Sequence, residues 1–294
     1  LQPNAVIFGD VGPDVRWVGN EAGHAGETCW ATYTPHAPYS GKMPGNGYTK
    51  DFEGTEGQRN GKYWMPAECD VPFRPGWFYH KSQDGKAKTA DSLWNLYFMS
   101  VGRGACLDLG LEPDQRGQLN ADDVAKLKEF GNKLKNTFAV NLARGATLKA
   151  SNVRVGDLRK FGPANLLDND RYSYWATDDK VHTPQLILDL HRTKVFNIIR
   201  LRENIKLGQR VDSVAIDAWL NGKWVQIAKA TSIGGNRLIR TSDIGARKIR
   251  IRVNSPVCIA LRDLGLYEDG PTIVELDNPP PQFPKKDTTS KSNL

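Results

Sequence analysis

Two acidic side chains, Glu21 and Glu27, lie in a glycine-rich stretch at residues 12–30, GPDVRWVGNEAGHAGETCW. The same stretch carries an arginine, a histidine and two tryptophans. Its apolar residues follow no period that would build a core helix or strand, so we expect a loop whose side chains are free for polar chemistry. Carboxylates beside aromatic rings predict a site that binds a polyol.

Further acids and aromatic residues stand where short strands are expected to end. Residues 5–8, AVIF, read as a fully buried strand and are soon followed by Asp10. Residues 63–67 form a second short strand that runs into Glu68, and the aromatic-rich turn RPGWFYH follows at 74–80. Acids and aromatic residues gathered after strands are typical of the carboxyl-end face of a parallel α/β barrel.

The remaining elements of the first half must position these side chains. Residues 33–62 show no sustained period and predict a long loop, residues 90–100 suit a helix and residues 105–111 a strand. Asn120 caps a longer helix whose apolar residues recur on one face. A full barrel takes about 250 residues, and only about 140 precede a change of pattern. We therefore expect the carboxyl-terminal portion of an α/β barrel, in a chain that begins with Leu1 because its start has been cut or processed away.

Beyond residue 143 the sequence changes to short alternating apolar runs separated by turn residues, such as Asn221-Gly222. This pattern predicts an all-β sandwich of roughly 125 residues. The expected strands cover residues 185–190, 196–201, 214–220, 223–227, 248–253 and 259–267. The predicted parts are thus a barrel portion at 1–143, a sandwich at 144–270 and a disordered tail at 271–294, where Pro, Lys, Ser and Thr dominate.

The positive charge of the chain, +7 overall, lies in its second half. Residues 1–145 hold 16 Lys and Arg against 17 Asp and Glu, whereas residues 146–294 hold 24 against 16. The basic residues alternate with apolar ones, as in RKIRIRV at 247–253, which favours strands with one solvated face over a nucleic-acid surface. No apolar run is long enough to span a membrane, no signal peptide stands at the front, and the Cys and His residues show no metal or disulfide spacing.

Four ordered segments of the first half resemble the catalytic barrel of α-L-fucosidases of glycoside hydrolase family 29, in the branch that favours α-1,3/4-linked fucose. The segments are GPDVRWVGNEAGHAGETCW, WMPAECD, RPGWFYH and LWNLYFMSVGRGACLDL. Family members follow the SVGR turn with Asn and a strand close to LLLN, where this chain has Gly104 and ACLDLG at 105–110. The family's nucleophile, an Asp in a WFDGA-like segment, has no counterpart in this sequence and is expected upstream.

The second half, from Ala146 to about Asp269, is similar to the discoidin-like (F5/8 type C) or family 32 carbohydrate-binding sandwich, a galactose-binding-like jelly roll. The segments that carry this resemblance are FGPANLLD, the tryptophan of RYSYWAT, QLILDLH, NGKWVQIA and LRDLGLYE.

The resemblance implies a retaining mechanism in which two carboxyl groups about 5–5.5 Å apart divide the work. One is the nucleophile. The other protonates the glycosidic oxygen and later deprotonates water, for which it needs a pKa raised by partial burial among apolar or aromatic walls. Glu21, flanked by Trp17 and Trp30, fits this acid/base role best. Glu27 is its rival, and Glu68 comes third.

The resemblance also implies contacts with the substrate. Trp77 matches the family's aromatic residue that packs on the apolar face and methyl group of fucose, with a core tryptophan as the alternative. Arg16 is a candidate donor to sugar hydroxyls, or else the partner of a nearby aspartate. Trp64 and His80 are further candidates for substrate binding, with structural roles as the alternative.

In the sandwich, Asp168, Asp170 and Glu268 are candidate ligands of the structural Ca²⁺ that similar modules often hold, and an Asp-Asn-Asp turn is the alternative. No cofactor is expected for catalysis. The aromatic candidates for sugar binding by this domain are Tyr172, Tyr174 and Trp175. Of these, Trp175 is expected in the core.

These features predict hydrolysis of terminal α-linked, α-1,3/1,4, L-fucose from fucosylated oligosaccharides or glycoconjugates. The alternative is a non-catalytic carbohydrate-binding or structural module. Without the nucleophile, the isolated chain is expected to be inactive, and neither a nucleic-acid partner nor a transmembrane segment is expected. By analogy with glycan-degrading fucosidases, the protein is expected to be exported to the periplasm or the exterior, with a signal in its precursor.

Overall fold

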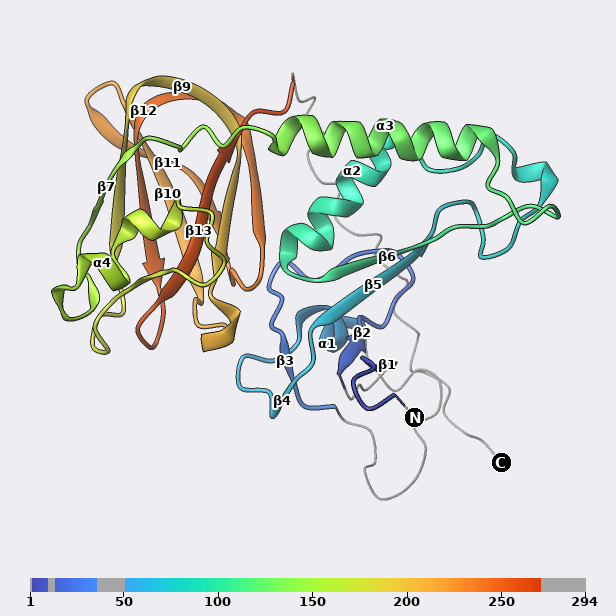
Figure 1. Cartoon of the computed structure of the whole chain (residues 1–294), viewed down its shortest axis with the longest axis horizontal. Helices are drawn as coiled ribbons and strands as arrows, with labels where there is room; N and C mark the ends of the chain where they lie inside the picture. Colours follow the sequence, from blue (N-terminus) through green and yellow to red (C-terminus); the bar gives the residue numbers. More distant parts are fainter. Residues whose placement is uncertain (1, 10–13, 36–50, 271–294) are drawn as a thin grey trace, which may run out of the picture.

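The first part of this protein contains a parallel sheet, the second part is built from antiparallel strands, and helix α3 leads from one part to the other (Figure 1). The computed structural model describes residues 2–9, 14–35 and 51–270. Asp10 and the tail predicted at 271–294 lie outside the described residues.

The first part contains a four-stranded sheet whose strands are all parallel and follow one another in chain order. Its strands are β1 (Phe8–Gly9), β2 (Val15–Trp17), β5 (Ala67–Pro72) and β6 (Cys106–Gly110). A separate two-stranded sheet pairs β3 (Thr32–Tyr33) with β4 (Tyr63–Trp64). Because the four strands are parallel, the loops that follow them leave from one edge of the sheet.

Strand β5 has an apolar face and a polar face, since successive side chains point to opposite sides of a sheet. On the apolar face, Val71 and Phe73, which directly follows the strand, pack with Leu93 of α2 (Ala90–Met99). Figure 1 shows α2 and α3 on this side of the sheet. The opposite face carries the acids of β5, and the helices do not cover it.

Helix α3 (Ala121–Phe138) begins where the sequence predicts it. The Asn120 side chain accepts a hydrogen bond from the main-chain N–H of Asp122 at 3.0 Å, which satisfies one of the free N–H groups at the helix start. The predicted loop at 33–62 differs from the structure, because its described end contains the short helix α1 (Asp51–Glu56).

Two further short helical elements of the α/β part and four of the sandwich complete the list. They are η1 (Lys81–Gln83), η2 (Val101–Arg103), η3 (Arg154–Gly156), α4 (Leu158–Phe161), η4 (Pro163–Leu166) and η5 (Ile205–Leu207).

The buried strand predicted at residues 5–8 is wrong. The strand β1 contains only Phe8 and Gly9, and the side chains of Val6, Ile7 and Phe8 are 73, 53 and 51 % exposed. Strand β1 lies at the edge of the sheet and pairs with β2 alone among the described strands. Its apolar side chains therefore have a neighbouring strand to pack beside on one side only.

Seven antiparallel strands form the second part, the predicted β-sandwich. They are β7 (Thr147–Ala150), β8 (Trp175–Ala176), β9 (Gln185–Glu203), β10 (Ser213–Leu220), β11 (Lys223–Ala230), β12 (Arg237–Asn254) and β13 (Ala260–Tyr267). The long strands β9 and β12 change register twice against each other and bend over the core. The first half of β9 pairs with β7 and its second half with β13, so one strand serves both layers.

The core of the sandwich is built from inward-facing residues of both layers. Trp175, Leu188 and Phe196 are fully buried, as expected for Trp175. Ala143 belongs to the same core, which therefore begins just after α3. The hairpin between β10 and β11 turns at Asn221, where a positive φ of 50° fits the predicted Asn-Gly turn.

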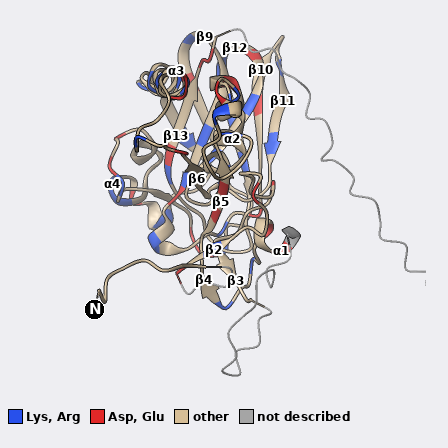
Figure 2. Ribbon diagram, turned by 90° about the vertical axis from the view of Figure 1, so that its right-hand side faces the viewer, with Lys and Arg blue, Asp and Glu red and all other residues tan. Residues whose placement is uncertain are grey.

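Basic residues of the sandwich are spread along several strands rather than gathered in one patch (Figure 2). Arg250 and Arg252 both pair with Asp217, at 2.7 and 2.8 Å. Arg247 pairs with Asp189, and its hydrogen bonds lower the pKa of that carboxyl to about 2. The exposed Arg247 agrees with the prediction of solvated strand faces, whereas Arg250 and Arg252 bind a buried carboxylate, because Asp217 is only 2 % exposed.

Apolar packing and main-chain hydrogen bonds join the two parts. Trp94 of α2 packs in one cluster with Leu238 of β12 and Tyr267 of β13. In the glycine-rich loop, the main-chain N–H of Cys29 donates to the Ser232 hydroxyl of the sandwich at 3.0 Å. The loop that carries the candidate acids is therefore anchored from both sides.

All four cysteines are free: Cys29 and Cys69 are buried, Cys258 is half-buried and Cys106 is exposed. None of the described helices is both long and apolar enough to cross a membrane.

A buried ion pair holds the segment after β5 against the start of α3. Arg74 donates to Asp123 at 2.7 Å and to Asp84 at 3.0 Å, and Arg74 and Asp123 are each only 1 % exposed. Replacing Arg74 by Met would leave the Asp123 carboxylate buried without its partner. We expect Arg74→Met to lower the free energy of unfolding in urea by about 3–5 kcal/mol.

The matched control is Arg116→Met, which removes the exposed partner of Asp114; this carboxylate keeps its hydrogen bonds from the main-chain N–H groups of residues 116 and 118. We expect this change to lie within the error of the same measurement. Equal stabilities of the two variants would contradict the role given to Arg74.

Candidate active site

Three acidic side chains lie on the uncovered face of the parallel sheet. Glu68 and Asp70 are two residues apart on β5, and Asp108 stands opposite Asp70 on β6. Adjacent strands are about 4.8 Å apart, so these three residues are neighbours, and we call them the carboxylate face. Trp17, the last residue of β2, is in register with Glu68 and completes the row on the other side.

Glu68 is a buried acid with no partner. Its side chain is 8 % exposed, and neither carboxylate oxygen has a hydrogen-bond partner among the described residues. Burial raises the pKa of this carboxyl to about 7, and the negative charges of Asp70 and Asp108 add to the shift. Buried polar groups are normally paired, so an unpaired one with a shifted pKa marks a candidate functional site.

Asp70 is positioned by an aromatic donor. The indole N–H of Trp17 donates to Asp70 Oδ1 at 2.6 Å. Burial raises the pKa of the Asp70 carboxyl; the hydrogen bond from Trp17 opposes the shift, and the charges of Glu21 and Asp108 add to it. Glu21 is thus within electrostatic reach of the carboxylate face.

Glu21 is hydrogen-bonded to Trp77 across the loops that follow β2 and β5. The indole N–H of Trp77 donates to Glu21 Oε2 at 2.8 Å. Both side chains are exposed in the described structure. The sequence predicts Glu21 between Trp17 and Trp30, but Trp30 is buried elsewhere, under the guanidinium of Arg59.

The loop that carries Glu21 is held in place at several points. Asn20 Oδ1 accepts the main-chain N–H of Ala22 at 3.0 Å, which forms an Asx turn around Glu21. Gly23 has a positive φ of 76°, and a Cβ atom there would meet Val71 at 2.9 Å, so a larger residue does not fit. The next residues are tied to the helices, because Arg103 donates to the carbonyl of Ala25 at 2.6 Å.

Trp77 owes its place to a glycine on the neighbouring strand. A Cβ atom at Gly110, the last residue of β6, would lie 2.7 Å from the indole ring. No positive φ is involved at this position. The absence of a side chain therefore leaves room for Trp77 at the carboxyl end of β6.

Glu27, the rival of Glu21, lies against the sandwich instead. Its carbonyl oxygen accepts hydrogen bonds from Thr231 Oγ1 at 3.0 Å and from the Arg237 guanidinium. Its charge acts on Arg237, whose pKa is lowered to about 10 by burial and by nearby Arg103, with Glu27 opposing the shift. The two acids of the glycine-rich loop therefore have separate surroundings.

Arg16 lies on the other side of the sheet from the carboxylate face. Its side chain is fully buried, donates to the carbonyls of Gly54 and Met65, and stacks over the ring of Tyr33. Burial lowers its pKa. Its role as a donor to sugar hydroxyls stays a prediction, and the described contacts assign the guanidinium to main-chain carbonyls.

Trp64 and His80 are exposed and lie outside the carboxylate face. Trp64 belongs to β4, opposite Thr32 in the small two-stranded sheet, and is 41 % exposed. His80 directly precedes η1 in the turn that also carries Trp77. Their proposed contacts with substrate stay predictions.

The predicted calcium ligands of the sandwich are not brought together. Asp168 and Asp170 form a turn in which each carboxylate accepts a main-chain N–H at 2.8 Å, which is the alternative expected from the sequence. The turn and Glu268 lie at opposite ends of β13. At the start of β13, Asn204 donates to the carbonyl of Tyr172 in the turn and to the carbonyl of Ala260. Glu268 follows the last residue of the same strand. Within the described part of the chain, no group of three His, Cys, Asp or Glu residues could hold a metal.

The aromatic candidates of the sandwich have different surroundings. Trp175 is fully buried and donates to the carbonyl of Asn152 at 3.0 Å, while Tyr172 is 55 % exposed. Tyr174 packs on Phe161. Tyr172 is therefore the most exposed of the three, but the ammonium of Lys206 lies over its ring, 4.2 Å from the centroid.

Asp108 is the member of the carboxylate face that sequence reasoning missed. Its segment, ACLDLG, departs from the family pattern, and nothing in that departure marks the aspartate as part of a site. The period of two on the parallel strands is the signal that could have found it, because it places Asp70 and Asp108 on one face once β5 and β6 are paired.

Known proteins are similar to this chain in both of its halves. The family model described as F5/8 type C domain matches residues 147–263. The curated protein "Alpha-L-fucosidase 1" of Arabidopsis thaliana is 37 % identical over 273 residues, which are 92 % of this chain and 52 % of the relative. The chain thus spans about half the length of the curated relatives it matches.

Solved structures give the same picture. A Ruminococcus gnavus GH29 fucosidase in complex with fucose superposes with a TM-score of 0.79 at 31 % identity, over 90 % of this chain and 52 % of that one. The structure named SpGH29 gives a TM-score of 0.81 at 32 % identity, over 90 % of this chain and 56 % of that one.

The unpaired Glu68 carboxyl should make stability depend on pH. Its pKa is about 7 in the folded chain, above the ordinary value of 4.5 that it has in the unfolded chain. The unfolded chain therefore loses this proton at a lower pH, and stability falls as pH rises from 4.5 to 7. Glu68→Gln removes this loss. We expect the variant to match the wild type at pH 4 and to exceed it at pH 8 by on the order of 2–3 kcal/mol in urea unfolding.

Glu203→Gln is the matched control. The pKa of Glu203 is also raised to about 7 by burial, but its carboxylate accepts the main-chain N–H groups of Arg210, Val211 and Gly234. Gln offers fewer acceptors there, so this variant should be less stable than the wild type at pH 8. A gain at Glu68→Gln that is the same at pH 4 and pH 8 would contradict the assignment.

Proposed function

Because this chain is homologous to the α-L-fucosidases of glycoside hydrolase family 29 and contains an F5/8 type C domain, we propose that the protein hydrolyses terminal α-linked L-fucose from glycans. The observation that carries the proposal is the Glu21–Trp77 pair beside the carboxylate face, at the carboxyl ends of parallel strands. An exposed acid, an aromatic ring and a row of carboxylates suit a sugar with polar hydroxyls and an apolar side. A carbohydrate-binding module without catalysis would not need the unpaired, buried Glu68.

The four parallel strands are proposed to be consecutive strands of a (β/α)₈ barrel. Two observations support this: their order in the sheet follows the chain, and α2 lies on the side away from the carboxylate face. The exposed apolar residues of β1 fit an edge that pairs with a further strand. We place the barrel portion at residues 1–143 and the sandwich at 144–270, although Ala143 already packs in the sandwich core.

Glu21 is the proposed general acid and base. As an acid it would protonate the glycosidic oxygen, and as a base it would then deprotonate the attacking water in a retaining mechanism. The hydrogen bond from Trp77 fixes the carboxyl at the mouth of the site. The nucleophile is proposed to be an aspartate on a segment that this sequence does not contain.

The other residues of the site are proposed to bind the sugar. The ring of Trp77 would cover the apolar face and the methyl group of fucose, and burial of that surface would supply the binding energy. Glu68, with a pKa of about 7, is partly protonated near neutral pH and can accept or donate a hydrogen bond to a hydroxyl. Asp70, held by Trp17, would accept a second hydroxyl.

We propose fucosylated oligosaccharides or glycoconjugates with α-1,3 or α-1,4 linkages as substrates, and a periplasmic or extracellular location. The linkage rests on the resemblance of the four sequence segments, and the location on analogy with other glycan-degrading fucosidases.

Removing the proposed acid should affect poor leaving groups most. In the full-length gene product, we expect Glu21→Gln to lower kcat/KM for a fucosylated oligosaccharide by about 10²–10⁴-fold. The loss should be much smaller for dinitrophenyl α-L-fucoside, whose leaving group needs no proton. Release of fucose is measured for both substrates.

The control is Glu27→Gln, the same change in the same loop, which should leave both rates near those of the wild type. Wild-type rates for Glu21→Gln on both substrates would overturn the assignment of the acid. Absence of fucose release from both substrates by the unsubstituted full-length gene product would overturn the proposed activity.

A methyl group at Gly110 should displace Trp77 and its hydrogen bond to Glu21. We expect Gly110→Ala to lower kcat/KM of the full-length gene product by roughly 10–100-fold, since small misplacements in a site have costs of this size. Gly131→Ala is the control, because a Cβ atom there meets nothing within 4 Å. Unchanged kinetics for Gly110→Ala would contradict the placement of Trp77.

A further inference from the structure

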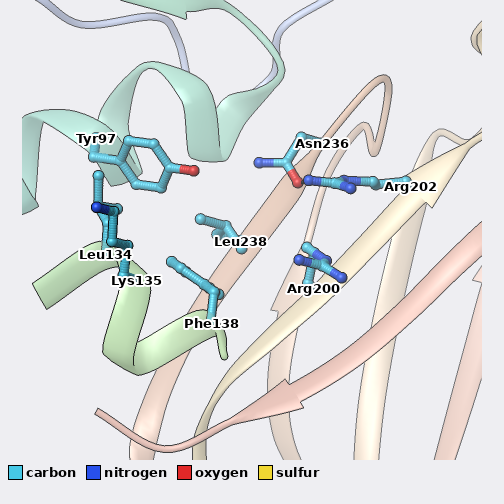
Figure 3. A pocket seen from close by; sticks show the side chains of 8 residues that line it. All are labelled: Tyr97, Leu134, Lys135, Phe138, Arg200, Arg202, Asn236 and Leu238. Atoms are coloured by element: carbon cyan, nitrogen blue, oxygen red, sulfur yellow. The ribbon is translucent and has the colours of Figure 1, made fainter. Parts of the chain in front are cut away.

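A cavity of about 270 Å³ lies between the helices of the α/β part and the sandwich (Figure 3). Tyr97 of α2 and Phe138 of α3 line one side, and Leu238 of β12 lies between them and the charged side. Arg200 and Arg202 of β9 line the opposite side. The lining of the cavity is therefore aromatic on one side and positively charged on the other.

The positive charge of this cavity is only partly balanced. Arg200 is paired with Asp263, whose two oxygens accept from the guanidinium at 2.7 and 3.2 Å. Arg202 donates to the neutral Asn236 side chain at 2.8 Å, and within residues 2–9, 14–35 and 51–270 it forms no ion pair. Lys135 of α3 adds a further positive charge to the rim.

Arg202 is held in surroundings that disfavour its charge. Burial lowers its pKa and the positive charge of Arg200 lowers it further, while the negative charge of Asp263 opposes the shift in part. A guanidinium stays charged under such conditions, so a nearby anion would stabilise it. The hydroxyl of Tyr97 points toward Asn236 and Arg202 and offers one more donor (Figure 3).

We propose that this cavity binds a small oxyanion, a carboxylate, sulfate or phosphate group, through Arg202, Lys135 and Tyr97. Arg202 presents a planar set of N–H donors that suits such a group, and the Tyr97 hydroxyl adds a donor from the aromatic side of the cavity (Figure 3). The volume lies below the usual ~300–1,000 Å³ of sites for larger ligands, so the occupant is a small anion or a small molecule that carries one. Binding there would join α2 and α3 to the sandwich.

The test is calorimetric titration of sulfate into the 294-residue chain, in chloride buffer of matched ionic strength. Phosphate and acetate titrations in the same buffer identify which oxyanion the cavity prefers. We expect saturable sulfate binding that is at least about tenfold weaker in Arg202→Gln, since one charge-assisted hydrogen-bond pair is removed. Lys135→Gln, at an exposed position that cannot disturb the core, should weaken binding severalfold.

Arg192→Gln is the matched control. Arg192 lies on the same strand, is exposed and does not line the cavity, so the variant carries the same change of charge. It should bind sulfate as the wild type does. Absence of saturable binding of all three anions to the wild type would overturn the proposal, and so would equal dissociation constants for all four proteins.

Discussion

The alternation of side chains along strand β5 is the constraint on which the rest of this structure depends. One set of residues, Val71 and Phe73, must be buried against α2, and this fixes the direction of the other set. Glu68 and Asp70 are therefore placed together on the opposite face, beside Asp108 of β6. A shift of β5 by one residue would bury the acids against the helix, so the apolar packing of one face determines the chemistry of the other.

The loops after the strands add the reactive group to this fixed base. Glu21 is held beside the carboxylate face because the glycine-rich loop is hydrogen-bonded to the helical segment at Ala25 and to the sandwich at Cys29. The position of Trp77 also depends on two other residues. The ion pair of Arg74 with Asp123 fixes the start of the turn that carries Trp77, and Gly110 has no side chain that would collide with its ring. The sandwich thus acts on the candidate site through the loop, although its own residues lie outside the carboxylate face.

Much of this arrangement can be predicted from the sequence, because local signals are strong where they act alone. The Asn120 cap, the apolar face of α3 and the Asn-Gly turn at 221 each have one physical meaning, and each prediction is confirmed. What fails depends on neighbours that are distant in the chain. The apolar run at 5–8 has the composition of a buried strand, but its burial depends on a second neighbour beside β1.

The arrangement of the candidate site also depends on residues that are distant in the chain. The motif around Glu21 identifies an acid, but its spacing cannot say that Trp77 rather than Trp30 lies beside it. Nor can it say that Arg16 turns away from Trp17, since that follows from the strand period only after the strand ends are known. Asp108 becomes visible only when β5 and β6 are paired.

The proposed mechanism depends most on Glu21 as the group that transfers the proton, and chemical rescue tests this role most directly. In the experiment, azide is added to Glu21→Ala of the full-length gene product together with an aryl α-L-fucoside. Azide is a nucleophile that needs no general base, so it can attack the glycosyl–enzyme intermediate, break its bond to the enzyme carboxylate and leave as α-L-fucosyl azide. We expect a rate that rises with azide concentration and formation of this retained product. A rate that does not respond to azide, with no fucosyl azide formed, would contradict the role of Glu21.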